Sequence, residues 1–236
     1  MPNAVETADT ATEMLLTRLR AFCFPHGEES ARAIRCVRTA ETGQIRMSPE
    51  ARWIPFRAEQ ILDATRSSFR WEARLDPGRI TSITVTDAYE EAHGFLSIKL
   101  GGVVPVTKVT GAEVDLGELQ RYLASIVLCP AILLNHLSLE CKATGPLTLQ
   151  LLDHEDKTGA AVEFDISPEG CPLACRANRP RLIGKRSVMT PWFATSWAFR
   201  EWEGMRVPRQ LKVSWQLPQG AFPYYVSEIT SYQAVT

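Results

Sequence analysis

The sequence predicts a mainly β fold of the α+β type, in which a strongly curved antiparallel sheet, or half-open β-barrel, packs against two helices. Three observations support this prediction. Apolar and polar residues alternate along many short segments, clusters of Gly, Pro, Asp and Asn separate those segments, and only two segments show a helical repeat. A length of 236 residues is ordinary for one β-rich domain with a sizeable core.

The clearest strands lie at the C-terminal end of the chain. Leu211, Val213 and Trp215 alternate with polar residues, which is typical of a strand with one buried face. Turn residues precede this strand at 203–204 and follow it at 218–220, so the segment from Phe199 to Val235 is predicted to form three antiparallel strands.

The same alternation predicts further strands in both halves of the chain. In the first half we expect a hairpin within 33–46 that turns near 41–43, followed by strands at 69–75, 80–89 and 96–100. In the second half we expect short strands at 137–143, 147–153, 160–166, 173–177 and 182–188.

Two amphipathic helices are predicted. Residues 10–22 follow a capping box, and residues 115–128 begin at Asp115 as the N-cap, with Glu118 at the reciprocal position. We therefore divide the chain into an N-terminal helix with its connection, 1–32, and one curved antiparallel β domain, 33–236, that contains the helix near 115–128.

Composition excludes several classes of protein. The formal net charge is -1 with no basic stripe, so nucleic acid is not an expected partner. Residues 1–12 lack a secretory pattern and no apolar run is long enough to span a bilayer, so we expect a cytoplasmic protein that does not insert into membranes. The six cysteines are scattered, and Cys171 and Cys175 lack zinc-site spacing, so we expect neither a metal nor a cofactor. Oligomeric state and cysteine pairing stay open.

No known catalytic motif is present, so candidate catalytic residues come from polar groups in apolar surroundings. Glu59 and Asp87 are candidates for proton transfer, because burial raises the pKa of a carboxyl group. Tyr89 and Arg121 are candidate supporting donors. The alternative is that the two acids form a structural ion-pair network with Arg74 or Arg121.

Other polar residues have simpler expected roles. Glu118 is expected to be a helix cap that can pair with Arg121. His26, His136 and His154 are expected at the surface, whereas His93, at the start of an apolar strand, is the better candidate for a base.

The aromatic residues suggest a pocket for an apolar ligand. Six tryptophans exceed what packing requires, and several lie in a segment, 192–202, that we interpret as loop-rich. Large flat rings hold polycyclic or polyunsaturated ligands, although each ring can equally belong to the core. The candidate substrate-binding residues are Trp71, Trp192, Phe193, Trp197, Trp215 and Tyr224.

Five motifs, at 55–60, 69–74, 87–89, 118–124 and 191–192, together resemble a bacterial family of unknown function numbered 6544. The resemblance runs from about Arg46 to the C-terminus and implies no known activity. Where that pattern has a small residue and an acid after Pro191-Trp192, this chain has Phe193 and Trp197, which indicates a pocket for a flatter ligand.

The segment 199–208 resembles the final hairpin of lipoprotein carriers of the LolA type. That resemblance implies a half-open barrel with an apolar interior that holds acyl chains.

Two functions follow from these features. The first is a cofactor-independent isomerase or cyclase of secondary metabolism, for example one that promotes an intramolecular cycloaddition by ordering an apolar substrate. The second is a non-catalytic carrier or sensor of a lipid-like metabolite. Paired acids and donors deep in the pocket would favour the enzyme, and a uniformly apolar groove would favour the carrier.

Overall fold

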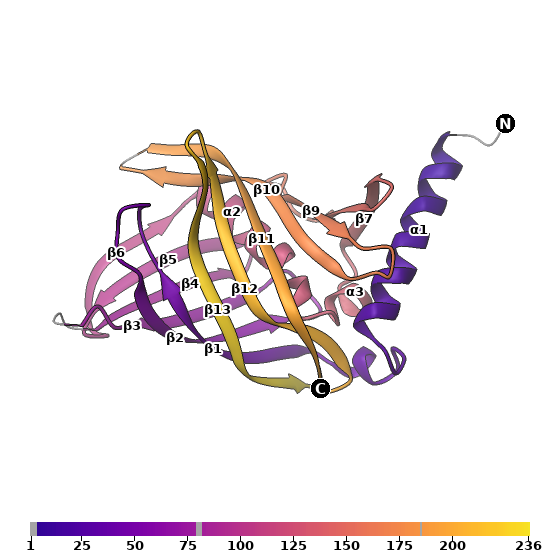
Figure 1. Ribbon diagram of the computed structural model, residues 1–236, viewed down its shortest axis with the longest axis horizontal. Coiled ribbons are helices and arrows are strands. Elements are labelled where there is room, and N and C mark those ends of the chain that lie inside the picture. The colour runs from indigo at the N-terminus through magenta and orange to yellow at the C-terminus, as the bar shows by residue number, and fades with distance from the viewer. Residues whose placement is uncertain (1–3, 79–81, 185) are drawn as a thin grey trace.

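The computed structural model describes residues 4–78, 82–184 and 186–236. Its described strands form one antiparallel sheet of thirteen strands in the order β6-β5-β4-β3-β2-β1-β13-β12-β11-β10-β9-β8-β7. Strands β1 and β13, the first and last of the chain, pair in the middle of the sheet and join its two halves. Within each half, strands that follow one another in the sequence lie side by side. Strands β6 and β7 are the two edges, and the sheet curves without closing (Figure 1).

The strands of the first half are β1 (Cys36–Ile45), β2 (Ile54–Asp63), β3 (Phe69–Leu75), β4 (Ile83–Glu90), β5 (His93–Leu100) and β6 (Val104–Thr110). Those of the second half are β7 (Leu139–Gly145), β8 (Thr148–Asp153), β9 (Ala161–Ile166), β10 (Pro172–Ile183), β11 (Arg186–Trp202), β12 (Met205–Leu217) and β13 (Gly220–Val235). The helices are α1 (Ala4–Cys23), α2 (Ala112–Ala124) and α3 (Ile132–Asn135), with short 3-10 turns at Ser30–Ala33 and Ser125–Val127.

Helix α2 packs against the inner face of the sheet and connects its two halves. The Asp115 carboxylate accepts a hydrogen bond from the Gly94 N–H of β5 at 2.7 Å, and the Gln120 amide donates to the Asn178 carbonyl of β10 at 3.0 Å. A Cβ at Gly94 would lie 2.6 Å from the Val114 carbonyl oxygen, so only glycine permits this approach of helix and strand. The core around α2 includes Leu119, Tyr122 and Leu123, all fully buried.

Helix α1 lies beside the β7 edge (Figure 1). The Thr12 hydroxyl accepts a hydrogen bond from the Ala143 N–H of β7 at 2.9 Å, and Arg20 donates to the Leu133 carbonyl at 3.1 Å. Covering an edge in this way satisfies backbone groups that would otherwise be open to pairing with another chain.

The predicted mainly β fold, its curved sheet and both packing helices are confirmed. The strand at 69–75 and the three C-terminal strands with turns at 203–204 and 218–220 are also confirmed. Strands β2 and β6 were not predicted.

Four local predictions are wrong. Residues 33–46 contain no hairpin turn, because Cys36–Ile45 is one strand in which Gly43 lets Phe56 and the β13 backbone approach closely. The run 182–188 is not one strand, because β10 ends and β11 begins within it. The segment 192–202 is strand rather than loop. Helix α2 begins at Ala112, with Gly111 rather than Asp115 as its N-cap.

Candidate functional site

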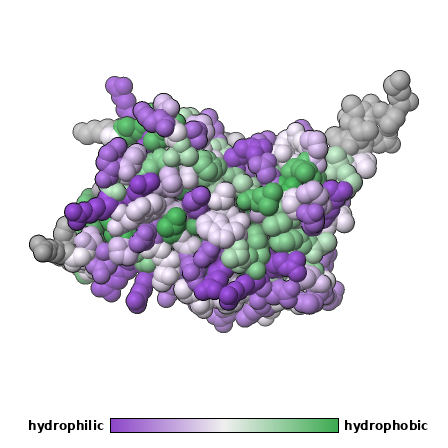
Figure 2. All heavy atoms as spheres, viewed as in Figure 1, coloured by the Kyte–Doolittle hydropathy of each residue, from purple (hydrophilic) through white to green (hydrophobic). Residues whose placement is uncertain are grey.

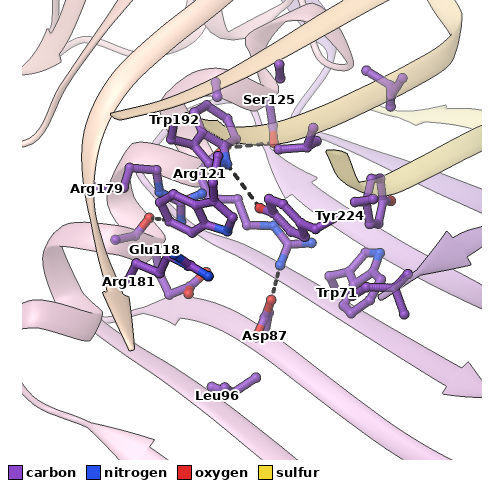
Figure 3. Close-up of a pocket in the computed structure, with 18 of the residues that line it drawn as sticks. Trp71, Asp87, Leu96, Glu118, Arg121, Ser125, Arg179, Arg181, Trp192 and Tyr224 are labelled. Carbon is purple, nitrogen blue, oxygen red and sulfur yellow. Dashed lines mark hydrogen bonds and ion pairs between the residues drawn. The ribbon is translucent and has the colours of Figure 1, made fainter. Parts of the chain in front are cut away.

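A cavity of about 550 Å³ lies between the concave face of the sheet and α2. Residues from both halves of the sheet line it, and most of the wall is aliphatic or aromatic, including Ile54, Leu96, Ile98, Val109, Leu211 and Val213. Charged side chains gather where α2 faces β4 and β10 (Figure 3). The site therefore combines an apolar body with one polar region, which is the usual composition of a small-molecule pocket.

Arg121 of α2 and Asp87 of β4 form an ion pair in the polar region. The guanidinium carbon of Arg121 lies 4.8 Å from the centre of the Trp71 ring and 5.1 Å from that of Phe69, so the cation is held between an acid and two aromatic faces. Burial opposes the charge on Arg121, but Asp87 and Glu118 outweigh it and raise the pKa of Arg121 above its usual value.

Glu41 of β1 is a buried acid on the wall of the cavity. Its Oε1 accepts hydrogen bonds from Trp71 Nε1 at 2.5 Å and from the Tyr225 hydroxyl at 2.7 Å. Phe56 stacks on Tyr225 with ring centres 5.3 Å apart. Burial, followed by the charge of Glu41, raises the pKa of Tyr225, so Tyr225 is a hydrogen-bond donor at neutral pH.

A second arginine, Arg179, packs against an aromatic ring, that of Trp192, where α2 faces β10. Arg179 of β10 donates to the Gly117 carbonyl at 2.6 Å, and its guanidinium lies 4.8 Å from the Trp192 ring centre. Trp192 Nε1 in turn donates to the Tyr224 hydroxyl at 3.0 Å, and Tyr224 stacks on Trp215. Figure 3 shows Trp192, Tyr224 and Arg179 converging on the cavity, from β11, β13 and β10 respectively.

Glu118 of α2 also lines the cavity and lies beside Arg179 and Arg181 in Figure 3. Burial and then the nearby charge of Asp87 raise the pKa of Glu118 to about 8, although Arg121 and Arg179 act in the opposite direction. A carboxyl group with this pKa is mostly protonated at pH 7 and can donate a hydrogen bond. The prediction that Glu118 caps the helix is therefore wrong, since the helix starts six residues earlier and Arg121 pairs with Asp87.

Four buried polar atoms on the cavity wall lack a hydrogen-bond partner within the described structure. They are Gln60 Nε2, Asp87 Oδ1, Glu118 Oε2 and Arg179 Nε. Buried polar groups are normally satisfied, so a set of donors and acceptors left open around one cavity indicates a place for a polar group of a ligand.

The structure brings together six of the residues predicted from the sequence. The cavity lining includes Asp87, Arg121, Trp71, Trp192, Trp215 and Tyr224. The pairing of Asp87 with Arg121, weighed above as the structural alternative, is also present.

The other predicted site residues lie elsewhere. Glu59 is exposed on the convex face, because Ala58 and Gln60 are the inward neighbours on β2; the expectation of an apolar setting for Glu59 is wrong. Tyr89 is buried at the end of β4 but lies outside the cavity lining. Phe193 and Trp197 also lie outside the lining, and Trp197 is 42% exposed.

The histidines lie outside this cavity. His93 is exposed, which does not suit a buried base. His136 is buried, contrary to expectation, and lies within hydrogen-bonding distance of Ser67 and Ser138, at 3.1 and 3.3 Å; burial lowers its pKa. The described residues contain no group of three potential metal ligands, and all six cysteines have free thiols.

Sequence reasoning missed Glu41, Gln60 and Arg179 on the cavity wall. Glu41 and Gln60 occupy inward positions of strands whose other inward residues are small or apolar, such as Phe56 and Ala58. A strict two-residue count from Phe56 would have placed Gln60 inside. Glu41 was hidden by its neighbour Gly43, which suggested a turn.

The model of a family of unknown function, DUF6920, matches residues 16–233. The chain belongs to this family. The resemblance to family 6544 is not confirmed, and the match to DUF6920 begins within α1 rather than near Arg46. No curated protein matches this DUF6920 member.

Several solved structures share the fold of this DUF6920 member at low identity. A DUF1329 family protein from Desulfovibrio piger has 8% identity and a TM-score of 0.54, over 96% of this chain and 92% of the other. A LolA superfamily protein from Nitrosomonas europaea has 9% identity and a TM-score of 0.51, over 95% and 94%. A domain described as that of an outer membrane lipoprotein-sorting protein, from Vibrio parahaemolyticus, has 10% identity and a TM-score of 0.50, over 98% and 93%. The predicted LolA-like architecture is thus confirmed at the level of the fold.

Proposed function

We propose that this DUF6920 member binds one lipid-like small molecule inside its curved sheet and acts as its carrier or sensor. The single observation that supports this most is the cavity itself, an apolar space of about 550 Å³ with polar groups gathered at α2. A volume of this size accommodates a ligand of drug or fatty-acid size. The fold shared with a LolA superfamily protein and a lipoprotein-sorting domain agrees with such a role.

The polar region defines what kind of molecule would fit. An apolar tail would lie along the aliphatic wall, and a polar head would lie near Glu118, where Glu118 Oε2, Asp87 Oδ1 and Arg179 Nε are open. A protonated Glu118 and the guanidinium of Arg179 would both donate to a carbonyl or carboxylate oxygen. We therefore infer a ligand with an apolar body and one oxygen-rich end.

A cavity-filling substitution tests this function. Ala194 of β11 lines the cavity, so Ala194→Trp should occupy ligand space, whereas Ala221 of β13 is exposed and Ala221→Trp should not. In a fluorescence titration with N-phenyl-1-naphthylamine, we expect wild type and Ala221→Trp to bind with the same affinity and Ala194→Trp to bind at least tenfold more weakly. Equal binding by all three proteins would place the probe outside the cavity and contradict the proposal.

One observation favours a second function, the cofactor-independent isomerase or cyclase. The pKa of Glu118, raised to about 8, suits a group that transfers a proton near neutral pH, and it replaces Glu59 as the candidate acid beside Asp87. The test compares the molecule recovered from wild type and from Glu118→Gln after incubation with the same lipid extract. Conversion of a bound compound by wild type alone would support catalysis; recovery of the identical compound from both proteins would support the carrier.

A further inference from the structure

Exposed apolar side chains gather at one end of the sheet. Because successive turns of an antiparallel meander alternate between ends, the strand order places the β1–β2, β3–β4, β5–β6, β10–β11 and β12–β13 turns at the same end. Nine of the fourteen large apolar side chains that are exposed among the described residues lie at this end, which marks it as unlike the rest of the surface. They are Met47, Leu100, Val103, Val104, Val106, Leu182, Ile183, Val188 and Met189.

This apolar end is continuous with the cavity. Met47 and Leu182 line the cavity although they are 72% and 60% exposed, so the cavity opens between the β1–β2 turn and the β10–β11 hairpin. Ile98 of β5 and Val109 of β6 carry the apolar wall toward the β5–β6 hairpin. Figure 2 shows apolar residues over the β10–β11 hairpin at the upper left of the molecule. We call the nine exposed apolar residues at this end the rim. An apolar ligand that leaves the cavity here would first meet the rim.

The charged residues on the two hairpins that carry most of the rim are all positive. The segments 97–110 and 177–200, which contain the β5–β6 and β10–β11 hairpins, include Lys and Arg but no Asp or Glu. Lys99, Lys108 and Arg186 are exposed. The acids near this end belong to other turns: Glu50 to β1–β2, Asp76 to β3–β4, and Glu155 and Asp156 to β8–β9. Glu155 and Asp156 line a second cleft together with Met189.

We propose that the β5–β6 and β10–β11 hairpins dock on an anionic phospholipid bilayer, with their apolar tips in the interfacial region and the cavity mouth facing the lipid. Basic residues beside apolar tips are the combination that binds such a surface. A second copy of the chain is disfavoured as the occupant, because two like-charged rims would repel each other. The proposal rests on the proposed function for the identity of the cargo, but docking is measured without any cargo.

Docking of this kind is compatible with the expectation of no membrane insertion, which concerned spanning segments. No helix among the described residues is long and apolar enough to cross a membrane. Docking through hairpin tips requires no such helix.

Strand β10 supplies a matched pair of variants for the test. Ile183 at the rim and Leu173 at the opposite end of the same strand are both 51% exposed. Ile183→Glu combined with Val103→Glu places two acids on the rim, where Val103 is 80% exposed, and Leu173→Glu places one acid away from it. None of these side chains lines the cavity, so the fold and probe binding should persist.

The experiment is cosedimentation with vesicles of phosphatidylcholine, with and without 30% phosphatidylglycerol. We expect wild type and Leu173→Glu to bind the anionic vesicles, at least tenfold more tightly than neutral ones, and to be released by 0.5 M salt. The Val103→Glu/Ile183→Glu protein should lose at least tenfold in binding while still binding N-phenyl-1-naphthylamine.

Three outcomes would overturn the docking proposal. In the first, wild type does not bind anionic vesicles. In the second, the Val103→Glu/Ile183→Glu and Leu173→Glu proteins lose the same amount of vesicle binding. In the third, wild type is a dimer in analytical ultracentrifugation and the Val103→Glu/Ile183→Glu protein is a monomer. The last would show that the rim joins two copies of the chain. Absence of probe binding in wild type with vesicle binding intact would instead contradict the proposed function alone.

Discussion

The indole Nε1 of Trp71 on β3 lies 2.5 Å from Oε1 of Glu41 on β1, and both side chains line the cavity from the concave face of the sheet. Tyr225 of β13 donates to the same oxygen. One buried carboxylate therefore connects the two halves of the sheet across the β1–β13 junction, at the wall where a ligand would lie.

We expect Glu41→Ala to be strongly destabilising. It would leave two buried donors, on Trp71 and Tyr225, without an acceptor, at a cost of about 1–3 kcal/mol for each donor. Glu72→Ala is the control, because Glu72 pairs with Arg70 on the exposed face, where a salt bridge contributes about 0–1 kcal/mol. Urea unfolding measures both. A loss for Glu41→Ala no larger than that for Glu72→Ala would show that the Glu41 contacts contribute little to stability.

Asp87→Asn should also destabilise the protein, because it leaves the partly buried Arg121 without its acid. Removing one partner of a fully buried pair costs about 3–5 kcal/mol, which is the upper limit for this pair. The double variant Asp87→Asn/Arg121→Met should recover part of that loss, since no uncompensated charge remains. Asp165→Asn is the matched control, as its pair with Arg176 is exposed. A double variant less stable than Asp87→Asn would contradict this interpretation.

Glu118 predicts a particular dependence of stability on pH. Its pKa is about 8 in the folded protein and 4.5 in its unperturbed state, so the folded state binds more protons between these values. The free energy of unfolding should therefore decrease as pH rises from 5 to 8, by at most about 1.4 kcal/mol per pH unit from this group. In Glu118→Gln the contribution disappears, so its stability relative to wild type should increase toward pH 8. Urea midpoints at pH 5, 6.5 and 8 measure the difference, and parallel curves for the two proteins would refute the raised pKa.

Trp192 and Trp197 should differ sharply in ligand binding. Trp192 lines the cavity, whereas Trp197 lies outside the lining and is partly exposed. Trp192→Phe retains an apolar ring but removes the donor to Tyr224, so binding of N-phenyl-1-naphthylamine should weaken several-fold with the fold intact by circular dichroism. Trp197→Phe should bind like wild type. Equal weakening by both substitutions would mean that the cavity is not the binding site.

The fold was largely predictable because period-two alternation survives wherever one face of a strand is buried. Strand β3, with Phe69 and Trp71 inward and Arg70 and Glu72 outward, is an example. The alternation failed at β1, where Glu41 and Gly43 occupy strand positions that normally favour apolar residues. Glu41 lines the cavity, and Gly43 permits the close packing of Phe56 and β13 beside it.

The site itself was predictable only in part. Asp87 and Arg121 stand out as polar residues in apolar segments, but the position of Glu118 in the cavity depends on the rotation of α2 relative to β4 and β10. That rotation follows from contacts such as Asp115 with Gly94 and Gln120 with Asn178, which join residues far apart in the sequence. Local patterns contain no information on such pairings.

Native mass spectrometry of the protein re-isolated from a phospholipid and fatty-acid extract tests ligand binding in the cavity without a reporter. We predict one additional lipid mass per chain for wild type and Ala221→Trp, and none for Ala194→Trp. Two results would contradict the proposal that this cavity holds a lipid-like molecule. The first is that wild type binds no lipid at any ratio of extract to protein, and the second is that Ala194→Trp binds as much lipid as wild type.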